Sequence, residues 1–142
     1  MSNLFDVAQH LVDLAAAQQH QVIDDLGVDV IGIEGASGAR AVSSLGVTMG
    51  VDRLVLQPGS AFPPHIHEGD HLLYVQSGTG SVYIDGVDHP LRAGQSVFIP
   101  AVYEHGLRGP RDGGPLTIIS FSTPHHPVDS AHRMTVIRTE QK

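Results

Sequence analysis

Short apolar runs, separated by glycine, proline and aspartate, occupy most of the chain. Runs of this length in which apolar and polar residues alternate predict strands with one buried face. Nine or ten short strands at turn-rich spacing predict a sandwich or a barrel. We expect these strands over residues 28–34, 41–45, 47–57, 72–75, 81–84, 87–89, 97–99, 106–108, 117–122 and 134–138.

Turn residues divide these runs. Asp85-Gly86 stands between two runs, and a two-residue Asp-Gly loop is a strong signal for a β-hairpin. Residues 35–38 (GASG) predict a turn after the first strand, and Gly50 is a candidate bulge within residues 47–57. Residues 108–115 (RGPRDGGP) predict an exposed loop.

The N-terminal segment has a different pattern. Asn3 is a candidate helix cap, and Asp6 would favour the positive end of the helix. We therefore expect one α-helix over residues 2–20, packed on the outside of the strands and contributing to a dimer interface. Residues 1–26 would form this helix and its lead-in, and residues 27–142 the barrel of a single domain. The apolar residues at helical spacing are Leu4, Val7, Ala8, Leu11, Leu14 and Ala15.

Histidines are concentrated in the middle of the chain. His65 and His67 lie two residues apart, so on a strand both imidazoles point to one side, and His71 follows closely. His105 lies in a second turn-rich stretch. Imidazole is a common ligand for zinc, iron, copper and nickel. The chain has ten histidines, so solvated histidines on a polar face are the alternative, but the apolar run at residues 72–75 favours a buried site.

The spacing around these histidines resembles two motifs of the cupin family. Gly59, five residues, His65-x-His67, then Tyr74-Val75 and Gly78 resembles the first motif, and Gly94, five residues, Pro100 and then His105 resembles the second. The resemblance implies an all-β double-stranded β-helix of jelly-roll type, to which we add the N-terminal α-helix. His71 stands where the family usually has a glutamate ligand, and Val102 where it usually has a glycine.

This resemblance implies that His65, His67, His71 and His105 bind one divalent transition metal per chain, which could be Fe, Zn, Ni, Mn or Cu. Neutral imidazoles bring no negative charge, so the ion would stay strongly Lewis acidic. The resemblance to small cupins favours an oxidoreductase of dioxygenase type acting on a small organic molecule. The alternatives are a non-redox isomerase, lyase or cyclase that uses Zn or Mn as a Lewis acid, and a small-molecule-binding cupin without catalysis.

The other candidate residues are less distinctive. Phe62 and Tyr103 lie near the ligand-bearing turns and are candidates for substrate contact, although core packing is the commoner role of such residues. No general base is identified from the sequence. His125, His126 and His132 suggest a second metal site, but adjacent residues of an extended chain point apart, so we do not expect one.

Charge and composition argue against several classes of partner and chemistry. The formal net charge of -7 argues against a nucleic-acid partner. The absence of cysteine excludes disulfide and thiolate chemistry. No apolar stretch is long enough for a membrane span, and the N-terminus does not resemble a secretory signal, so we expect a cytoplasmic protein. Small barrels of this kind usually pair, so we expect a homodimer.

Overall fold

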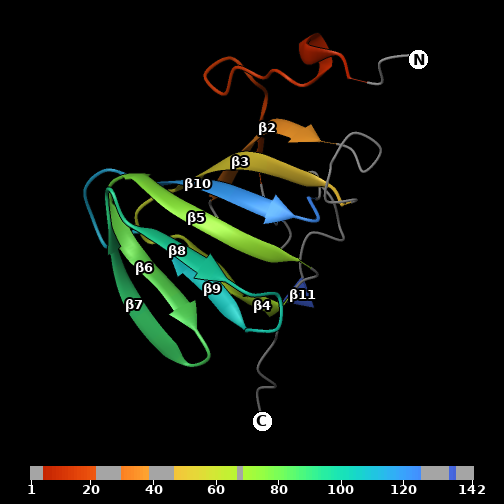
Figure 1. Cartoon of the computed structure of the whole chain (residues 1–142). Coiled ribbons are helices and arrows are strands. Elements are labelled where there is room, and N and C mark those ends of the chain that lie inside the picture. Colours follow the sequence, from red (N-terminus) through yellow and green to blue (C-terminus); the bar gives the residue numbers. More distant parts are fainter. Residues whose placement is uncertain (1–4, 22–29, 39–46, 67–68, 126–134, 137–142) are drawn as a thin grey trace.

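The computed structural model describes residues 5–21, 30–38, 47–66, 69–125 and 135–136 (Figure 1). Two antiparallel sheets form the fold, which confirms the all-β class. The six-stranded sheet has the order β1-β2-β3-β10-β5-β8, and the five-stranded sheet has the order β11-β4-β9-β6-β7. Sequence neighbours are thus often separated in space: β10 lies between β3 and β5.

The strands of the six-stranded sheet are β1 (Gln19–Gln21), β2 (Val30–Gly38), β3 (Met49–Leu56), β5 (Asp70–Ser77), β8 (Ser96–Ile99) and β10 (Leu116–Thr123). The strands of the five-stranded sheet are β4 (Ala61–Ile66), β6 (Thr79–Ile84), β7 (Val87–Arg92), β9 (His105–Arg108) and β11 (Thr135–Val136). The expected strand over residues 41–45 lies outside the described residues.

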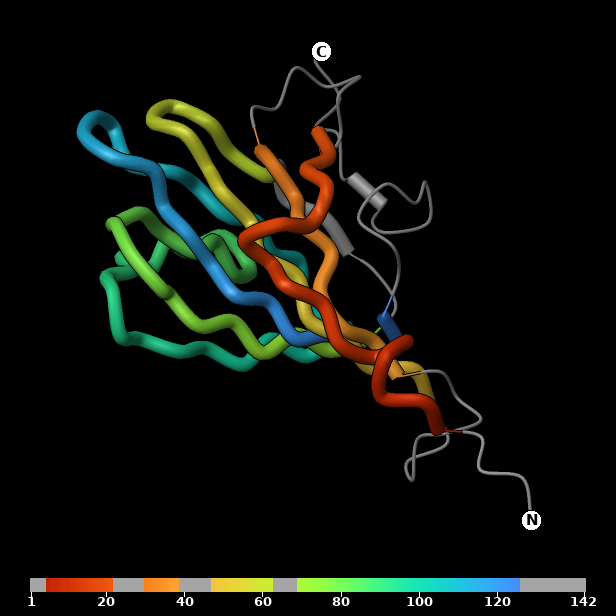
Figure 2. The backbone as a smooth tube through the Cα atoms, turned by 90° about the horizontal axis from the view of Figure 1, so that it is seen from above, coloured from red at the N-terminus to blue at the C-terminus, as the bar shows by residue number. Residues whose placement is uncertain are grey.

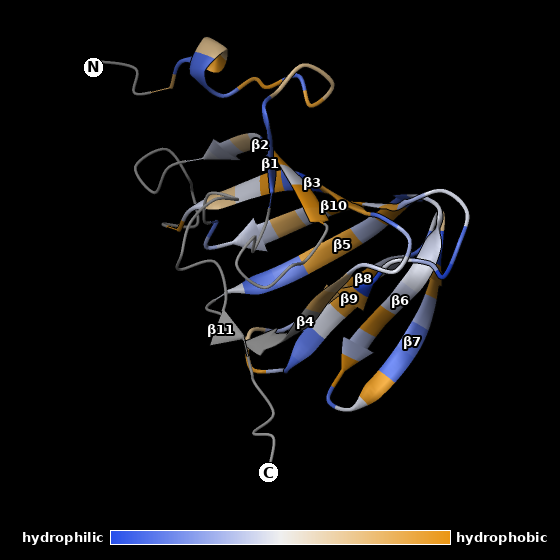
Figure 3. Cartoon of the chain, turned by 180° about the vertical axis from the view of Figure 1, so that it is seen from behind, coloured by the Kyte–Doolittle hydropathy of each residue, from blue (hydrophilic) through white to orange (hydrophobic). Residues whose placement is uncertain are grey.

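The core lies between the two sheets. Alternate residues of each strand point inward, so hydrophobic and hydrophilic bands follow one another along the strands (Figure 3). Burying apolar side chains contributes about 25 cal/mol per Å² and is the main stabilising term. The cluster of buried residues consists of Val30, Leu54, Leu56, Phe62, Leu73, Val75, Val82, Leu91, Ile99, Leu107, Leu116 and Ile118.

The register of β10 determines which residues of the six-stranded sheet point inward. Ser120 pairs with Asp52 on one side and with Leu73 on the other, and all three are buried. The next residue, Phe121, pairs with Val51 and Leu72, and Phe121 and Leu72 are exposed on the outer face. A shift of one residue would exchange these two sets.

The hairpin between β6 and β7 confirms the Asp-Gly prediction. Ile84 pairs with Val87, so Asp85 and Gly86 form the whole loop. Both have positive φ, 45° at Asp85 and 91° at Gly86. Positive φ at both central residues is the geometry of a type I′ turn, whose twist matches that of the two strands.

The N-terminal α-helix was predicted wrongly. The described segment 5–21 contains one 3-10 helix, η1 (Val7–Gln9), and then β1, which pairs with β2. The Asp6 side chain accepts a hydrogen bond from the backbone N of Ala8 (3.1 Å). The Asp13 side chain accepts one from the backbone N of Ala15 (2.9 Å) in the same way. Local bonds from aspartate compete with a continuous helix, and here they break it into turns.

The turn expected at residues 35–38 is also absent, because β2 continues through it. Glu34 pairs with Asp52, and Ser37 pairs with Gly50, so β2 carries one extra residue opposite β3. The bulge predicted at Gly50 of β3 therefore lies on the partner strand, next to Gly35 and Ala36. A glycine cluster marks a turn and a bulge equally well, and pairing with β3 decided between them.

Two further features of the fold complete the description. The N-terminal segment runs across the outer side of the six-stranded sheet (Figure 2). Residues 111–114 are exposed, as expected for the loop before β10. Within the described part of the chain, no helix has the length and the apolar character needed to cross a membrane.

The type I′ turn leads to a prediction. Gly86→Ala should destabilise the protein by about 1–2 kcal/mol, because an L side chain at positive φ is strained. A Cβ atom at Gly86 would meet only Tyr83, at 4.0 Å, so the effect would be conformational. Urea unfolding measures it. Gly114→Ala is the control, since a Cβ atom there meets nothing within 4 Å and no positive φ is involved. An equal effect of both substitutions would contradict this account.

Candidate metal centre

His105 is the most deeply buried of the described histidines that the sequence proposed as ligands. It begins β9, and it is 3% exposed. Its Nδ1 lies 2.9 Å from the backbone carbonyl oxygen of Tyr103. A carbonyl can only accept, so Nδ1 carries the proton and donates it. Nε2 is then the unprotonated nitrogen, and an unprotonated nitrogen is the form that binds a metal.

His71 lies beside His105, although it belongs to the other sheet. It is the second residue of β5 and is half-buried. The two ring centroids are 5.8 Å apart, and the rings meet edge to face at 69°. Metal–nitrogen bonds of about 2.0–2.1 Å would place the ring centroids of two imidazoles on one ion roughly 4.5–5.2 Å apart at octahedral or tetrahedral angles, so the observed spacing is slightly wider than a shared ion requires. The His71 Nδ1 lies 3.1 Å from the Ser120 Oγ.

Asp70 joins the two segments that carry these histidines. Its carboxylate accepts a hydrogen bond of 3.0 Å from the backbone N of Ala101, in the loop that leads to His105. The start of β5 is therefore fixed against this loop. A bond of this kind holds ligands from different strands in place, as supporting hydrogen bonds do in metal sites.

The other two predicted ligands are less fully described. The backbone of His65 lies in β4 and pairs directly with His105 in β9. His67 lies outside the described residues, as does the His65 side chain. The structure therefore brings together His71, His105 and the backbone of His65, and the complete four-histidine set stays a prediction.

The surroundings of His105 favour its neutral form. Burial lowers the pKa of His105 below its ordinary value of 6.5, and the hydrogen bond to the Tyr103 carbonyl raises it in part. Ile84 is its neighbour on β6, and Ile99 lies opposite His71 on β8. An apolar site disfavours a charged imidazolium, so the ring stays available as a ligand at neutral pH.

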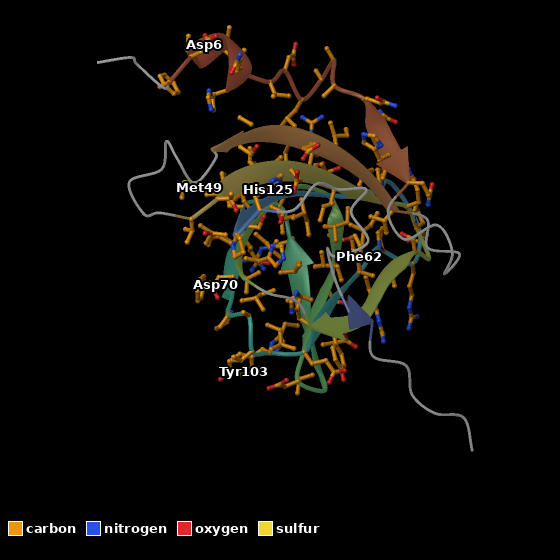
Figure 4. The ribbon with its side chains drawn as sticks, turned by 90° about the vertical axis from the view of Figure 1, so that its right-hand side faces the viewer. Asp6, Met49, Phe62, Asp70, Tyr103 and His125 are labelled. Atoms are coloured by element: carbon orange, nitrogen blue, oxygen red, sulfur yellow. The ribbon has the colours of Figure 1, made fainter. Side chains whose placement is uncertain are left out.

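The two residues predicted to contact substrate lie in different surroundings. Phe62 is buried in the core cluster, and its pairing partner on the neighbouring strand β9 is Leu107. Tyr103 is exposed, and its carbonyl fixes His105. Figure 4 shows Phe62 between the strands and Tyr103 at the periphery of the molecule. Their contact with substrate stays a prediction.

A cleft of about 780 Å³ lies mainly on the outer face of the six-stranded sheet, beside the N-terminal segment. Its lining includes His71 but not His105. The aromatic, histidine and leucine side chains among the lining residues are Phe5, His10, His71, Leu72, Phe98 and Phe121.

Three residues that lie far apart in the sequence form a second polar cluster, and no sequence motif marks Glu34 or Asp52. Glu34, Asp52 and His125 each offer a ligand atom, and these atoms lie within 4.8 Å of one another. His126 and His132, which we had considered with His125, lie outside the described residues. No sequence spacing marks this cluster, because each residue comes from a different strand or connection.

The family can now be assigned. The sequence model of the cupin domain matches residues 52–122, half of the chain, and this range contains every predicted ligand. The chain is a cupin. The match begins in β3 and ends in β10, so it includes Asp52 of the second cluster but neither Glu34 nor His125.

Comparisons with individual cupins extend this result. The chain is 43% identical over 54 residues to the dimethylsulfoniopropionate lyase DddW of Ruegeria pomeroyi, a match that covers 37% of the chain and 36% of the lyase. It covers less than half of each curated relative that it matches.

Two solved structures share the fold. The polyketide cyclase RemF of Streptomyces resistomycificus has a TM-score of 0.66 at 14% identity, and the match covers 92% of this chain and 86% of RemF. A predicted oxalate decarboxylase from Thermotoga maritima also has a TM-score of 0.66, at 19% identity, over 81% of this chain and 99% of its own. At these identities the likeness shows the fold.

The lowered pKa of His105 predicts how the stability of the metal-free protein depends on pH. The unfolded chain takes up the proton more readily than the folded one, so the unfolding free energy should fall as the pH drops below about 6.5. His105→Asn should remove this part of the loss. Urea unfolding with a chelator at pH 7.5 and pH 5.5 measures it. His89→Asn, at an exposed position of β7, is the matched control; equal pH dependence in the two variants would contradict the assignment.

Proposed function

We propose that the chain is a metal-dependent enzyme that binds one divalent transition metal at His65, His67, His71 and His105 and acts on a small organic molecule. The observation that carries the proposal is His105: its ring is buried, Nδ1 is held by the Tyr103 carbonyl, and the ring lies edge to face with His71. The pairing of the His65 backbone with His105 supports the same set.

Each residue of the centre has a part in this proposal. The Tyr103 carbonyl fixes the His105 tautomer, and the Ser120 hydroxyl contacts the His71 Nδ1. When bound, the metal would supply Lewis acidity that polarises a substrate oxygen or lowers the pKa of a bound water. The apolar neighbours Ile84 and Ile99 make the surroundings of the centre less polar, which strengthens electrostatic effects inside it.

Between the possible reaction classes, we propose Lewis-acid chemistry of the lyase or cyclase kind. Two relatives bear such names, the lyase DddW and the cyclase RemF. Neutral imidazoles leave the charge of the ion uncompensated, which favours polarisation of a substrate. The dioxygenase expected from the sequence uses the same ligands and stays a prediction. A cupin that binds a metal and a small molecule without turnover is the remaining alternative.

Metal content tests the centre. His105→Ala should contain one fewer tightly bound ion per chain than the wild-type protein, because the variant removes a preorganised ligand. Inductively coupled plasma mass spectrometry on both purified proteins measures this. His89→Ala, which removes an exposed imidazole, is the matched control and should keep the wild-type content. Equal metal content in His105→Ala and the wild type would refute the centre.

The reaction class is tested on protein reconstituted with Zn or Fe. Lewis-acid chemistry predicts turnover with Zn and without oxygen, and dimethylsulfoniopropionate is the first substrate to try because of the DddW relationship. Oxygen uptake with enolate or catechol substrates, seen with Fe alone, would instead establish the dioxygenase. A metal-loaded protein that binds these compounds without turnover would leave the binding function.

We also propose that the chain forms a homodimer. Val51, Phe121, Leu72 and Phe98 are consecutive partners across the outer face of the six-stranded sheet. The last three are 46–58% exposed, an unusual amount of apolar surface in a row. A two-fold axis could place this row against the same row of a second copy, and the exposed apolar residues of the N-terminal segment would extend the contact.

The dimer predicts the behaviour of Phe98→Lys. A charge at the β8 end of the row should shift the protein to monomer, because an unpaired charge in an apolar interface is costly. Light scattering after size-exclusion chromatography measures the mass. Val102→Lys is the control, since Val102 is 80% exposed on the loop after β8 and is not one of the paired residues of the row. A wild-type protein that is already monomeric would refute the dimer.

A further inference from the structure

Polar residues interrupt the apolar inner face of the six-stranded sheet. Asp52 and Ser120 are fully buried, whereas Leu54 and Ile118, the next inward residues on the same strands, belong to the core. Glu34 lies opposite Asp52 on β2. A buried carboxylate is unfavourable unless other groups compensate its charge. The position of Asp52 therefore requires a specific arrangement around it.

His125 provides the first part of this arrangement. Its Nε2 lies 3.0 Å from one Asp52 carboxylate oxygen and 3.1 Å from the other. The two side chains are 4% and 0% exposed. The backbone N of His125 donates to the Thr48 Oγ1 (3.1 Å), so the chain after β10 is fixed against the segment before β3. Figure 4 shows His125 beside β3.

The backbone of β3 makes room for this ring. A Cβ atom at Gly50 would lie 2.5 Å from the His125 Cγ, closer than any real contact. Only glycine lets the imidazole come this close to the strand and reach Asp52, two residues further on. The glycine at position 50 of β3 therefore provides the space that the His125 ring occupies.

Glu34 gives the cluster its third donor. One ligand atom from each of Glu34, Asp52 and His125 lies within 4.8 Å of the other two. A hydrogen bond between Asp52 and His125 needs no second carboxylate, and a second carboxylate nearby adds repulsion between like charges. A cation between the three groups turns this repulsion into attraction.

We propose that Glu34, Asp52 and His125 bind a divalent cation, at a second metal site separate from the four-histidine centre. Two donors of one ion, bound at about 2.0–2.2 Å, stand about 2.8–3.6 Å apart at octahedral or tetrahedral angles. The two distances from the His125 Nε2 to Asp52 fall in this range. The three ligand atoms lie within 4.8 Å of one another, so the Glu34 carboxylate must move closer to the other two groups to bind the same ion. The long side chain of Glu34 is only half-buried.

The donor types indicate which ions fit. Two carboxylates and one imidazole form a harder ligand set than four imidazoles, and they suit Mn²⁺ as well as Zn²⁺. The two carboxylates would also neutralise a divalent charge, which the four-histidine set does not do. The two sites should therefore differ in metal preference, the second site being the relatively better one for Mn²⁺.

Ser120 lies between the two sites. It is the direct partner of Asp52 across the ladder, and its Oγ contacts the His71 Nδ1. An ion at the second site would therefore place positive charge one strand away from a residue that touches the first centre. None of the residues of the second site is a ligand of the first, so the two sites can be tested separately.

The experiment counts ions bound to the full-length chain after chelation and dialysis, by calorimetric titration with Mn²⁺ and then Zn²⁺. The wild type should bind two Zn²⁺ ions per chain. His105→Ala should lose one and keep the other. Glu34→Gln and Asp52→Asn should each weaken the other ion at least tenfold. Asp112→Asn, which removes one carboxylate from an exposed loop, is the charge-matched control and should bind as the wild type does.

Each further outcome decides between the sites. If Glu34→Gln and Asp52→Asn bind both metals like the control, the second site is refuted and the Asp52–His125 contact is a hydrogen bond alone. Asp52 is buried, so Asp52→Asn could fail to fold; the half-buried Glu34→Gln then decides the question. If the wild type binds a single ion, and this ion is lost in His105→Ala and kept in Glu34→Gln, the second site alone is refuted. If the single ion is kept in His105→Ala and lost in Glu34→Gln, the four-histidine centre is refuted and the second site is supported.

Discussion

The register of β10 between β3 and β5 is the constraint on which both polar clusters depend. Because side chains alternate along a strand, this register turns Asp52 and Ser120 inward, and it turns Phe121 and Leu72 outward. Seven residue pairs join β10 to β3, from Leu116–Leu56 to Ser122–Gly50. A shift in register would have to break all seven pairs. It would also expose the apolar residues Leu54 and Ile118, which are buried in the observed register.

Within this frame, electrostatics separates the two clusters. His105 is buried among apolar residues and stays neutral, and the Tyr103 carbonyl selects its tautomer. The second cluster gathers carboxylates around one imidazole. A cation would meet no ligand charge in the first cluster and two carboxylates in the second. Ser120 lies between the two clusters.

Much of the fold could be predicted from local patterns. The β6–β7 hairpin was predictable because Asp85-Gly86 adopts the one turn geometry that such a pair favours. The prediction of an N-terminal helix was wrong, although apolar residues do recur there at helical spacing. Asp6 and Asp13 accept hydrogen bonds from nearby backbone N–H groups, and β1 pairs with β2 in the sheet. Residues 35–38 formed a strand with a bulge, because pairing with β3 outweighed the turn preference of glycine. Propensity is a weak guide where long-range pairing competes with it.

The sequence by itself determined the cupin family and the choice of candidate ligands, since motif spacing is a local property of the chain. It placed His71 and His105 in one centre, and the structure brings their rings together. Only the tertiary structure decided that Glu34, Asp52 and His125 meet, since they come from β2, from β3 and from the connection after β10. Residues that lie far apart along the chain become neighbours through strand order and register alone. No spacing rule within the sequence contains that information.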